Sequence, residues 1–284
     1  MIVWRDGDFV EADSAVSADD RGWLIGDAVF ETILVECGAP AFLERHLDRM
    51  RRGCAVLGIE RRLAADELRA AIAKTAEKNA LSGRAACRLT LSRTGGTRGL
   101  APHPAARAQL VISSAAVGSS PEALRVALST RRRWTGASTN GFKCAGAYAE
   151  NMLARAEAAS RGADEALMLN EFGRVACATS ANIFIVSDKV AMTPPLTEGA
   201  MPGVVRGVLM EEARGLGIDC REQQLTRADL ASGTLLLTNS IAGPVRSALD
   251  GALAARGREA ARMLIAAYAR RLDYEFRGQS GERA

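Results

Sequence analysis

The sequence predicts an α/β fold with two domains. The chain has 284 residues, of which 48% are hydrophobic, and this is enough for two sizeable cores. Stretches in which apolar and polar residues alternate, as they do in strands, are interspersed with stretches whose apolar residues recur at helical spacing. We expect an N-terminal α/β domain over residues 1–133, a linker over 134–140 and a C-terminal domain over 141–284.

Composition and charge exclude several classes of partner. The formal charge of +4 is small for this length, and the arginines are dispersed among acids, so no nucleic-acid binding is expected. No apolar run approaches the roughly 20 residues that span a bilayer, and the N-terminus lacks a signal pattern. We therefore expect a cytoplasmic protein without membrane association. The six cysteines are scattered and histidines are few, which favours reduced thiols over disulfides or a metal site.

The N-terminal half contains regular elements with clear signatures. Residues 1–10 form two alternating runs around an Asp-Gly turn, which predicts a hairpin. In the next strand, Phe30 and Glu31 lie on opposite faces because side chains alternate along a strand. The remaining elements are expected to be a helix that begins at Phe42, a helix over 64–79, and strands over 86–92, 109–113 and 125–129.

A glycine-rich loop follows the strand predicted over 86–92. It spans residues 93–100 and carries Arg93 and Arg98 at a strand end, a combination that could bind an anion. Neither the spacing nor a following helix matches a nucleotide phosphate loop. The loop is therefore a candidate site for a small anionic substrate.

Lys143 lies in a small and apolar neighbourhood. The next cations along the chain are Arg155 and Arg161, so its amine has no charged neighbour in sequence. Burial disfavours the charged form of an amine, and a neutral amine can form a Schiff base with a carbonyl. The alternative is a lysine that reaches from a strand end into solvent.

The C-terminal half alternates strands and helices in the same way. Small polar residues over 134–140 are typical of a hinge or a substrate-facing loop. A polar tail over 278–284 is expected to be disordered. The regular elements are predicted to be helices over 151–160, 205–216 and 256–274 and strands over 164–169, 217–222 and 235–240.

Several ordered blocks carry a resemblance to a known family. They are Lys143-x4-Tyr148-x2-Asn151, Gly173-Arg174-Val175-x3-Thr179-Ser180-x-Asn182, and Thr193-Pro194-Pro195-Leu196 followed by Gly199-Ala200-Met201-Pro202-Gly203. From about Arg21 to about Gly251, the chain resembles the class IV pyridoxal-phosphate enzymes. That family contains branched-chain and D-amino-acid aminotransferases and 4-amino-4-deoxychorismate lyase. The resemblance implies fold type IV, a C-terminal cofactor-binding domain, pyridoxal 5'-phosphate in the interdomain cleft, and a homodimer.

The resemblance also assigns roles to single residues. Lys143 would bind the cofactor and move the proton, and Tyr148 would hydrogen-bond its phenolate oxygen. Arg49, in the pattern His46-x2-Arg49, would grip the phosphate, for which a planar guanidinium is suited. Further phosphate donors would be the backbone N–H groups of Val204 and Val205 at a helix start and the hydroxyl of Ser240.

One position departs from the family pattern. Two residues after Val175 the family has a glutamate that pairs with the pyridine nitrogen, and this chain has Cys177. A thiol, with an ordinary pKa of about 8.5, cannot match a carboxylate as the partner of a pyridinium. The electron sink should therefore be weaker, which harms transamination more than an elimination.

The predicted substrate is an amino-acid-like carboxylate. Phe30 lies on the cleft face, Arg98 matches an arginine of the family's substrate loop, and Arg246 is a candidate second carboxylate site. D-amino-acid aminotransferases place a histidine two residues after that arginine, whereas this chain has Leu100. We therefore expect a lyase that converts 4-amino-4-deoxychorismate to 4-aminobenzoate and pyruvate. The alternatives are an aminotransferase for branched-chain or D-amino acids, and a cofactor-binding protein with weak or lost activity.

Overall fold

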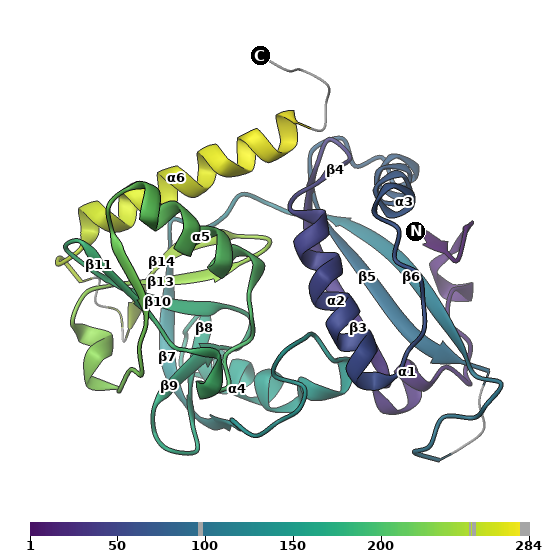
Figure 1. Cartoon of the computed structure of the whole chain (residues 1–284), viewed down its shortest axis with the longest axis horizontal. Helices are drawn as coiled ribbons and strands as arrows, with labels where there is room; N and C mark the ends of the chain where they lie inside the picture. Colours follow the sequence, from purple (N-terminus) through teal and green to yellow (C-terminus); the bar gives the residue numbers. More distant parts are fainter. Residues whose placement is uncertain (96–98, 250, 252–253, 279–284) are drawn as a thin grey trace. The chain divides into compact units, whose positions relative to one another are not determined.

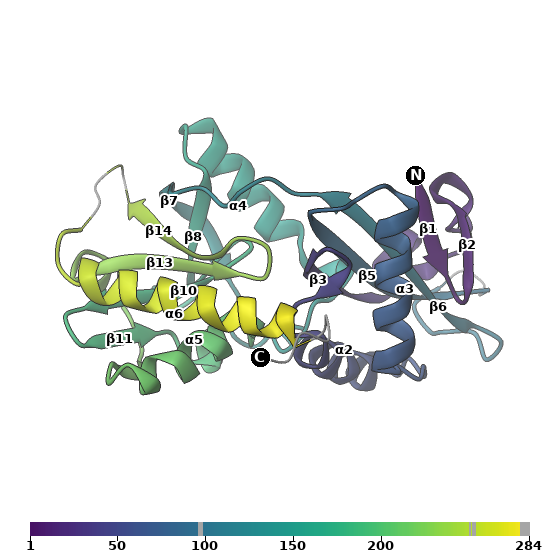
Figure 2. The same ribbon diagram turned by 90° about the horizontal axis from the view of Figure 1, so that it is seen from above.

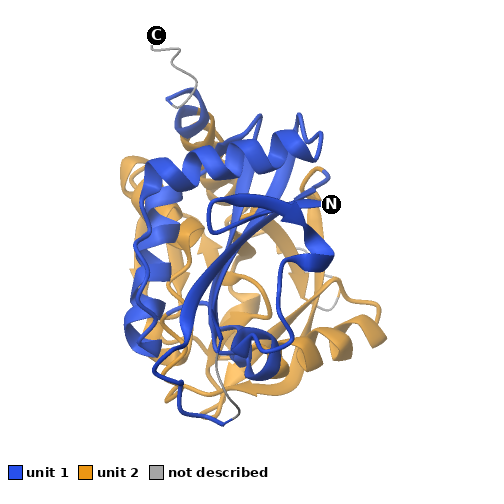
Figure 3. Ribbon diagram, turned by 90° about the vertical axis from the view of Figure 1, so that its right-hand side faces the viewer, with its two compact units in different colours: residues 1–118, 142–147, 274–284 blue, residues 119–141, 148–273 orange. Residues whose placement is uncertain are grey.

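The computed structural model describes residues 1–95, 99–249, 251 and 254–278, and the chain divides into two compact units (Figure 3). Unit 1 comprises residues 1–118, 142–147 and the chain from 274 onward, and unit 2 comprises 119–141 and 148–273. Each unit has its own β-sheet, so the mixed α/β class is as predicted. In the described part of the chain, no helix is long and apolar enough to cross a membrane.

Unit 1 is built on a six-stranded sheet with the strand order β2-β1-β6-β5-β3-β4. All neighbouring strands are antiparallel, and the predicted hairpin over 1–10 is β1 and β2. The strands are β1 (Ile2–Arg5), β2 (Asp8–Glu11), β3 (Ala28–Glu36), β4 (Ala39–Pro40), β5 (Arg84–Thr94) and β6 (Arg107–Ala116). The helices are α1 (Arg21–Ile25), α2 (Leu43–Leu57) and α3 (Ala65–Lys78) (Figures 1 and 2).

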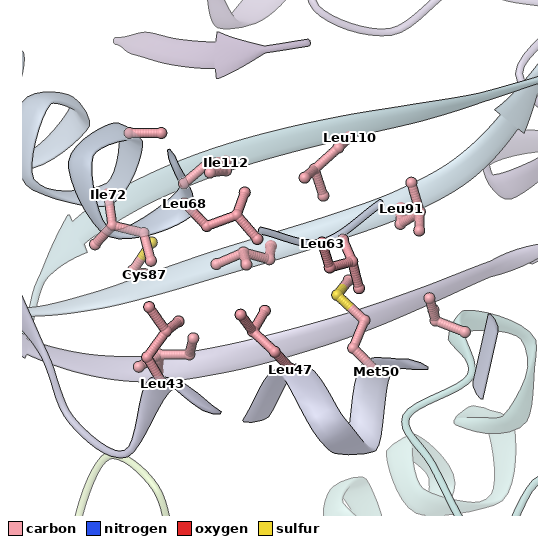
Figure 4. Close-up of a cluster of buried hydrophobic side chains, with 14 of the residues drawn as sticks. Leu43, Leu47, Met50, Leu63, Leu68, Ile72, Cys87, Leu91, Leu110 and Ile112 are labelled. Atoms are coloured by element: carbon pink, nitrogen blue, oxygen red, sulfur yellow. The ribbon is translucent and has the colours of Figure 1, made fainter. Parts of the chain in front are cut away.

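Helices α2 and α3 pack on one face of this sheet (Figure 4). Their apolar side chains join one buried cluster with alternate residues of the strands, including Leu43, Leu47, Met50, Leu68, Ile72, Val29, Ile33, Cys87, Leu89, Leu91, Leu110 and Ile112. Because side chains alternate along a strand, Phe30 of β3 and Arg88 of β5 lie on the face away from the helices. That second face carries the Phe30 ring and the Arg88 guanidinium, which are described below.

The segment 142–147 returns to unit 1 and lies along β3. The N–H of Phe30 donates to the carbonyl oxygen of Lys143 at 2.9 Å, and Val29 and Cys144 form an isolated antiparallel bridge. Gly26, with a positive φ of 72°, approaches so closely that a Cβ there would lie 2.5 Å from the Cα of Gly146. These contacts fix the backbone on which Lys143 stands.

Unit 2 is built on an eight-stranded mixed sheet with the order β12-β11-β10-β13-β14-β7-β8-β9. β7 is parallel to both β8 and β14, and β11 is parallel to β12. The strands are β7 (Ala123–Arg133), β8 (Glu165–Asn170), β9 (Val175–Ala178), β10 (Asn182–Ser187), β11 (Val190–Thr193), β12 (Asp219–Glu222), β13 (Thr234–Asn239) and β14 (Gly243–Leu249). The helices are α4 (Ala149–Ser160), α5 (Val204–Gly215) and α6 (Arg258–Arg277), of which the last enters unit 1 at residue 274.

The division into units differs from the predicted domain boundaries. The prediction assigned residues 125–129 to the N-terminal domain, but β7 hydrogen-bonds to β8 and β14 of the second sheet. The first segment of unit 1 therefore ends at residue 118. The chain then enters unit 2, and residues 142–147 belong to unit 1 again. A strand's partners are set by pairing across the sheet, which the alternation within one strand does not encode.

Candidate active site

Lys143 is a half-buried amine above an aromatic ring in unit 1. Its Nζ lies 5.1 Å from the centroid of the Phe30 ring. Burial, together with the positive charges of Arg49 and Arg88, lowers the pKa of Lys143 from 10.5 to about 8, and the negative charge of Glu31 opposes this shift. A sizeable fraction of this amine is therefore neutral slightly above neutral pH and can act as a nucleophile or a base.

Arg49 is held by a buried carboxylate. Its Nε and Nη2 donate to the two oxygens of Glu31 at 2.7 and 2.6 Å, and Nδ1 of His46 lies 2.7 Å from the same carboxylate. Burial opposes ionisation of Glu31, but hydrogen bonds from Arg49 and His46 outweigh it and lower its pKa to about 2. Burial lowers the pKa of His46, so its ring is neutral at pH 7 and the Nδ1–H donates to the carboxylate.

Arg88 is a cation near Lys143 that the sequence analysis missed. Its guanidinium lies 3.8 Å from the centroid of the Phe30 ring, and its Nε donates to Oγ1 of Thr90 at 3.1 Å. Arg88 is exposed, on the face of the sheet that carries Phe30. Strand alternation over 86–92 could have placed Arg88 opposite the core, but only the pairing of β5 with β3 puts it beside Phe30.

The predicted anion-binding loop after β5 is only partly described. Arg98 lies outside the described residues. The loop re-enters the described chain at Gly99, where Arg21 donates from Nη1 to the carbonyl oxygen of Gly99 and from Nη2 to that of Leu100, both at 2.8 Å. Asp27 accepts from Nε of Arg21 at 2.9 Å, so a buried ion pair anchors this end of the loop.

In unit 2, Tyr148 and Cys177 belong to neighbouring elements. Tyr148 is the residue before α4, and Nδ2 of Asn151 in that helix donates to the carbonyl oxygen of Thr179, just after β9, at 2.7 Å. Cys177 is buried on β9 beside Met168 of β8. Burial raises the pKa of the Cys177 thiol, against a lowering by the charge of Arg133. The thiol is therefore neutral at pH 7.

At the start of α5, the backbone of Gly203 lies very close to the side chain of Asn182. Gly203 precedes the helix, and a Cβ on it would lie 1.9 Å from Oδ1 of Asn182, whose Nδ2 donates to the carbonyl oxygen of Met201 at 2.8 Å. Val204 and Val205 open the helix, where backbone N–H groups lack helical acceptors and attract anions. The strand of Asn182 pairs with β13, and Ser240 directly follows β13.

Arg246, the remaining predicted residue, lies on β14 of unit 2. Its Nη2 donates to Glu122 at 2.9 Å. Glu122 is 90% exposed, so this ion pair is solvated and weak. Unit 1 thus brings together Phe30, Arg49 and Lys143, whereas Tyr148, Cys177, Val204, Val205, Ser240 and Arg246 belong to unit 2.

Comparison with known proteins identifies the family. Residues 28–248 match the model of amino-transferase class IV, and the chain belongs to this family. It is 29% identical over 273 residues to a branched-chain-amino-acid aminotransferase of Salmonella typhimurium, covering 90% of this chain and 87% of that protein. It is 27% identical over 249 residues to the aminodeoxychorismate lyase of Bacillus subtilis, covering 84% and 83%.

Solved structures agree with this assignment. The crystal structure of a branched-chain aminotransferase from Thermoproteus uzoniensis with norvaline superimposes with a TM-score of 0.88 and 28% identity, covering 97% of this chain and 95% of that chain. A second branched-chain amino acid aminotransferase, solved with pyridoxamine 5'-phosphate, gives a TM-score of 0.85 at 25% identity, covering 98% and 96%. The predicted membership of the class IV pyridoxal-phosphate family is confirmed.

Proposed function

We propose that the protein is a pyridoxal-phosphate-dependent lyase that splits 4-amino-4-deoxychorismate into 4-aminobenzoate and pyruvate, a step toward folate. Family membership supplies the cofactor class, since a relative in the family is a complex with pyridoxamine 5'-phosphate. The residues of this chain fit the group. A lysine of lowered pKa can bind its aldehyde, and the start of α5, where Gly203 provides no side-chain cap for the first backbone N–H groups, suits a phosphate.

The chain's own residues then have distinct tasks. Lys143 would hold the cofactor covalently and carry the proton from the substrate Cα, which a pKa of about 8 permits near neutral pH. The phosphate would be held by Arg49, by the N–H groups of Val204 and Val205 and by Ser240, and Tyr148 would donate to the phenolate oxygen. When bound, pyridoxal phosphate supplies an electron sink for the carbanion formed at Cα.

The observation that carries the lyase proposal is the neutral, buried thiol of Cys177. Burial raises its pKa, so the thiol does not provide the negative charge that a glutamate would offer to a pyridinium. Loss of one charged hydrogen bond at a reacting centre costs on the order of 2–4 kcal/mol, or roughly 10² to 10³ in rate. An elimination, in which a leaving group departs as the proton is removed, depends less on that sink than transamination does.

Arg88 supports an anionic substrate. Its exposed guanidinium and the Lys143 amine both lie against the Phe30 ring, at 3.8 and 5.1 Å from its centroid. A substrate whose Cα lies beside the Lys143 amine would thus have an arginine within reach of a carboxylate. Aminodeoxychorismate carries carboxylates that could use this cation.

A second candidate is an aminotransferase for branched-chain or D-amino acids. The names of the relatives favour it, since the Salmonella typhimurium protein is a branched-chain-amino-acid aminotransferase. A third candidate, a cofactor-binding protein with weak or lost activity, also follows from Cys177. We further propose a cytoplasmic homodimer, which sedimentation of the purified protein would test for its oligomeric state.

The deciding experiment follows 4-aminobenzoate and pyruvate together after cofactor-loaded protein is mixed with aminodeoxychorismate. Equal release of both products, absent from Lys143→Ala, supports the lyase. No release from protein that keeps its visible cofactor absorbance contradicts it. A screen of amino donors, read as conversion of the cofactor to its amine form, then separates an aminotransferase from a protein without either activity.

A further inference from the structure

A carboxylate is buried among apolar side chains on the helix-facing side of β3. Glu31 is 0% exposed, and its neighbours on the same face, Val29 and Ile33, belong to the hydrophobic cluster of unit 1. Taking a carboxylate and its partner out of water costs free energy that the ion pair recovers only in part. Well-packed apolar side chains would serve stability as well, so the buried Glu31 calls for another reason.

Glu31 fixes the orientation of Arg49. Two nitrogens of the guanidinium, Nε and Nη2, bind the two carboxylate oxygens at 2.7 and 2.6 Å. A planar group held through two parallel hydrogen bonds cannot rotate without breaking both. His46, one turn before Arg49 on α2, donates to the same carboxylate, so a single residue of β3 holds two side chains of the helix.

We infer that Glu31 is a positioning residue for the cofactor, acting through Arg49 and Lys143. It presents Arg49 to the phosphate, and its negative charge offsets the positive charge of Arg49 beside the Lys143 amine. This role rests on the proposed assignment of Arg49 to the phosphate. The electrostatics agree with it, because Glu31 raises and Arg49 lowers the pKa of Lys143.

The test is Glu31→Gln in the cofactor-loaded protein, a change that keeps the size of the side chain and removes its charge. We expect the dissociation constant for pyridoxal phosphate to rise about tenfold or more. We also expect the pH midpoint of the visible absorbance of the lysine-linked cofactor to fall by about one unit, because a compensating negative charge is lost. Glu31→Asp keeps the charge but shortens the side chain, so binding should weaken while the midpoint stays near that of the wild type.

A matched control is Asp27→Asn, which removes another carboxylate paired with a buried arginine of unit 1, Arg21, at 2.9 Å. It should lower the Tm without moving the midpoint. If Glu31→Gln also lowers only the Tm, Glu31 has a structural role and the inference is overturned. If Glu31→Gln does not fold, a dissociation constant of Glu31→Asp for pyridoxal phosphate equal to that of the wild type overturns the inference. Arg49→Ala distinguishes a failure of the phosphate assignment from a failure of the role of Glu31. If Arg49→Ala binds the cofactor as tightly as the wild type, the assignment of Arg49 to the phosphate is refuted. If Arg49→Ala weakens binding but the Glu31 variants bind as tightly as the wild type, only the role of Glu31 is refuted.

Discussion

The lowered pKa of Lys143 predicts that this lysine destabilises the cofactor-free protein at neutral pH. The pKa falls from 10.5 to about 8 because burial disfavours the ammonium form and Arg49 adds a positive charge nearby. At about 1.4 kcal/mol for each pKa unit, keeping the amine protonated costs about 3 kcal/mol of folding free energy. Lys143→Met removes the charge and retains an unbranched chain, so we expect it to stabilise the cofactor-free protein by up to about 3 kcal/mol at pH 7.

The sign of the pH dependence follows from proton binding. Between pH 8 and 10.5 the unfolded chain keeps the lysine proton and the folded chain releases it. The unfolded state then binds more protons, so the stability of the wild type rises with pH through this window. The advantage of Lys143→Met should therefore be complete below about pH 8 and shrink toward pH 10.5.

Urea unfolding of both proteins after removal of the cofactor measures this difference at pH 7, 9 and 10. Lys74→Met, which removes an exposed lysine of α3, controls for the general loss of one positive charge. An advantage of Lys143→Met that stays constant over this range, or a destabilisation at pH 7, would refute the desolvation of the Lys143 amine.

Three further predictions concern the site. Cys177→Glu should raise transamination by roughly 10²-fold because a carboxylate strengthens the electron sink, and the rate of cofactor conversion by an amino acid alone measures it; an unchanged rate contradicts the account. Arg88→Ala should raise the KM for aminodeoxychorismate by about tenfold or more with a smaller effect on kcat, since a carboxylate loses its cation; a wild-type KM in steady-state assays would exclude a substrate role. Gly203→Ala should lower stability by about 1–3 kcal/mol and weaken cofactor binding, because its Cβ would meet Oδ1 of Asn182 at 1.9 Å; thermal unfolding and cofactor titration check this, and wild-type values for both would show that Asn182 moves aside.

Local spacing in the sequence located most helices closely. The helix predicted over 64–79 is α3 (Ala65–Lys78), and the one predicted over 205–216 is α5 (Val204–Gly215). Apolar periodicity and glycine or proline boundaries are properties of neighbouring residues, so they are visible in the chain itself. The family blocks around Lys143 and Thr193 are likewise local, and they identified the family that the comparisons confirm.

Only the tertiary structure decided which residues surround Lys143. Glu31 precedes Arg49 by 18 residues and reads in the sequence as one more position of an alternating strand, yet it holds that arginine in the core. Arg88 reaches the Phe30 ring only through the register of β5 against β3. Sheet pairing and desolvation depend on residues far apart in sequence. The sequence by itself therefore determined the elements and the family, whereas folding determined the charge state of Lys143 and the partners that set it.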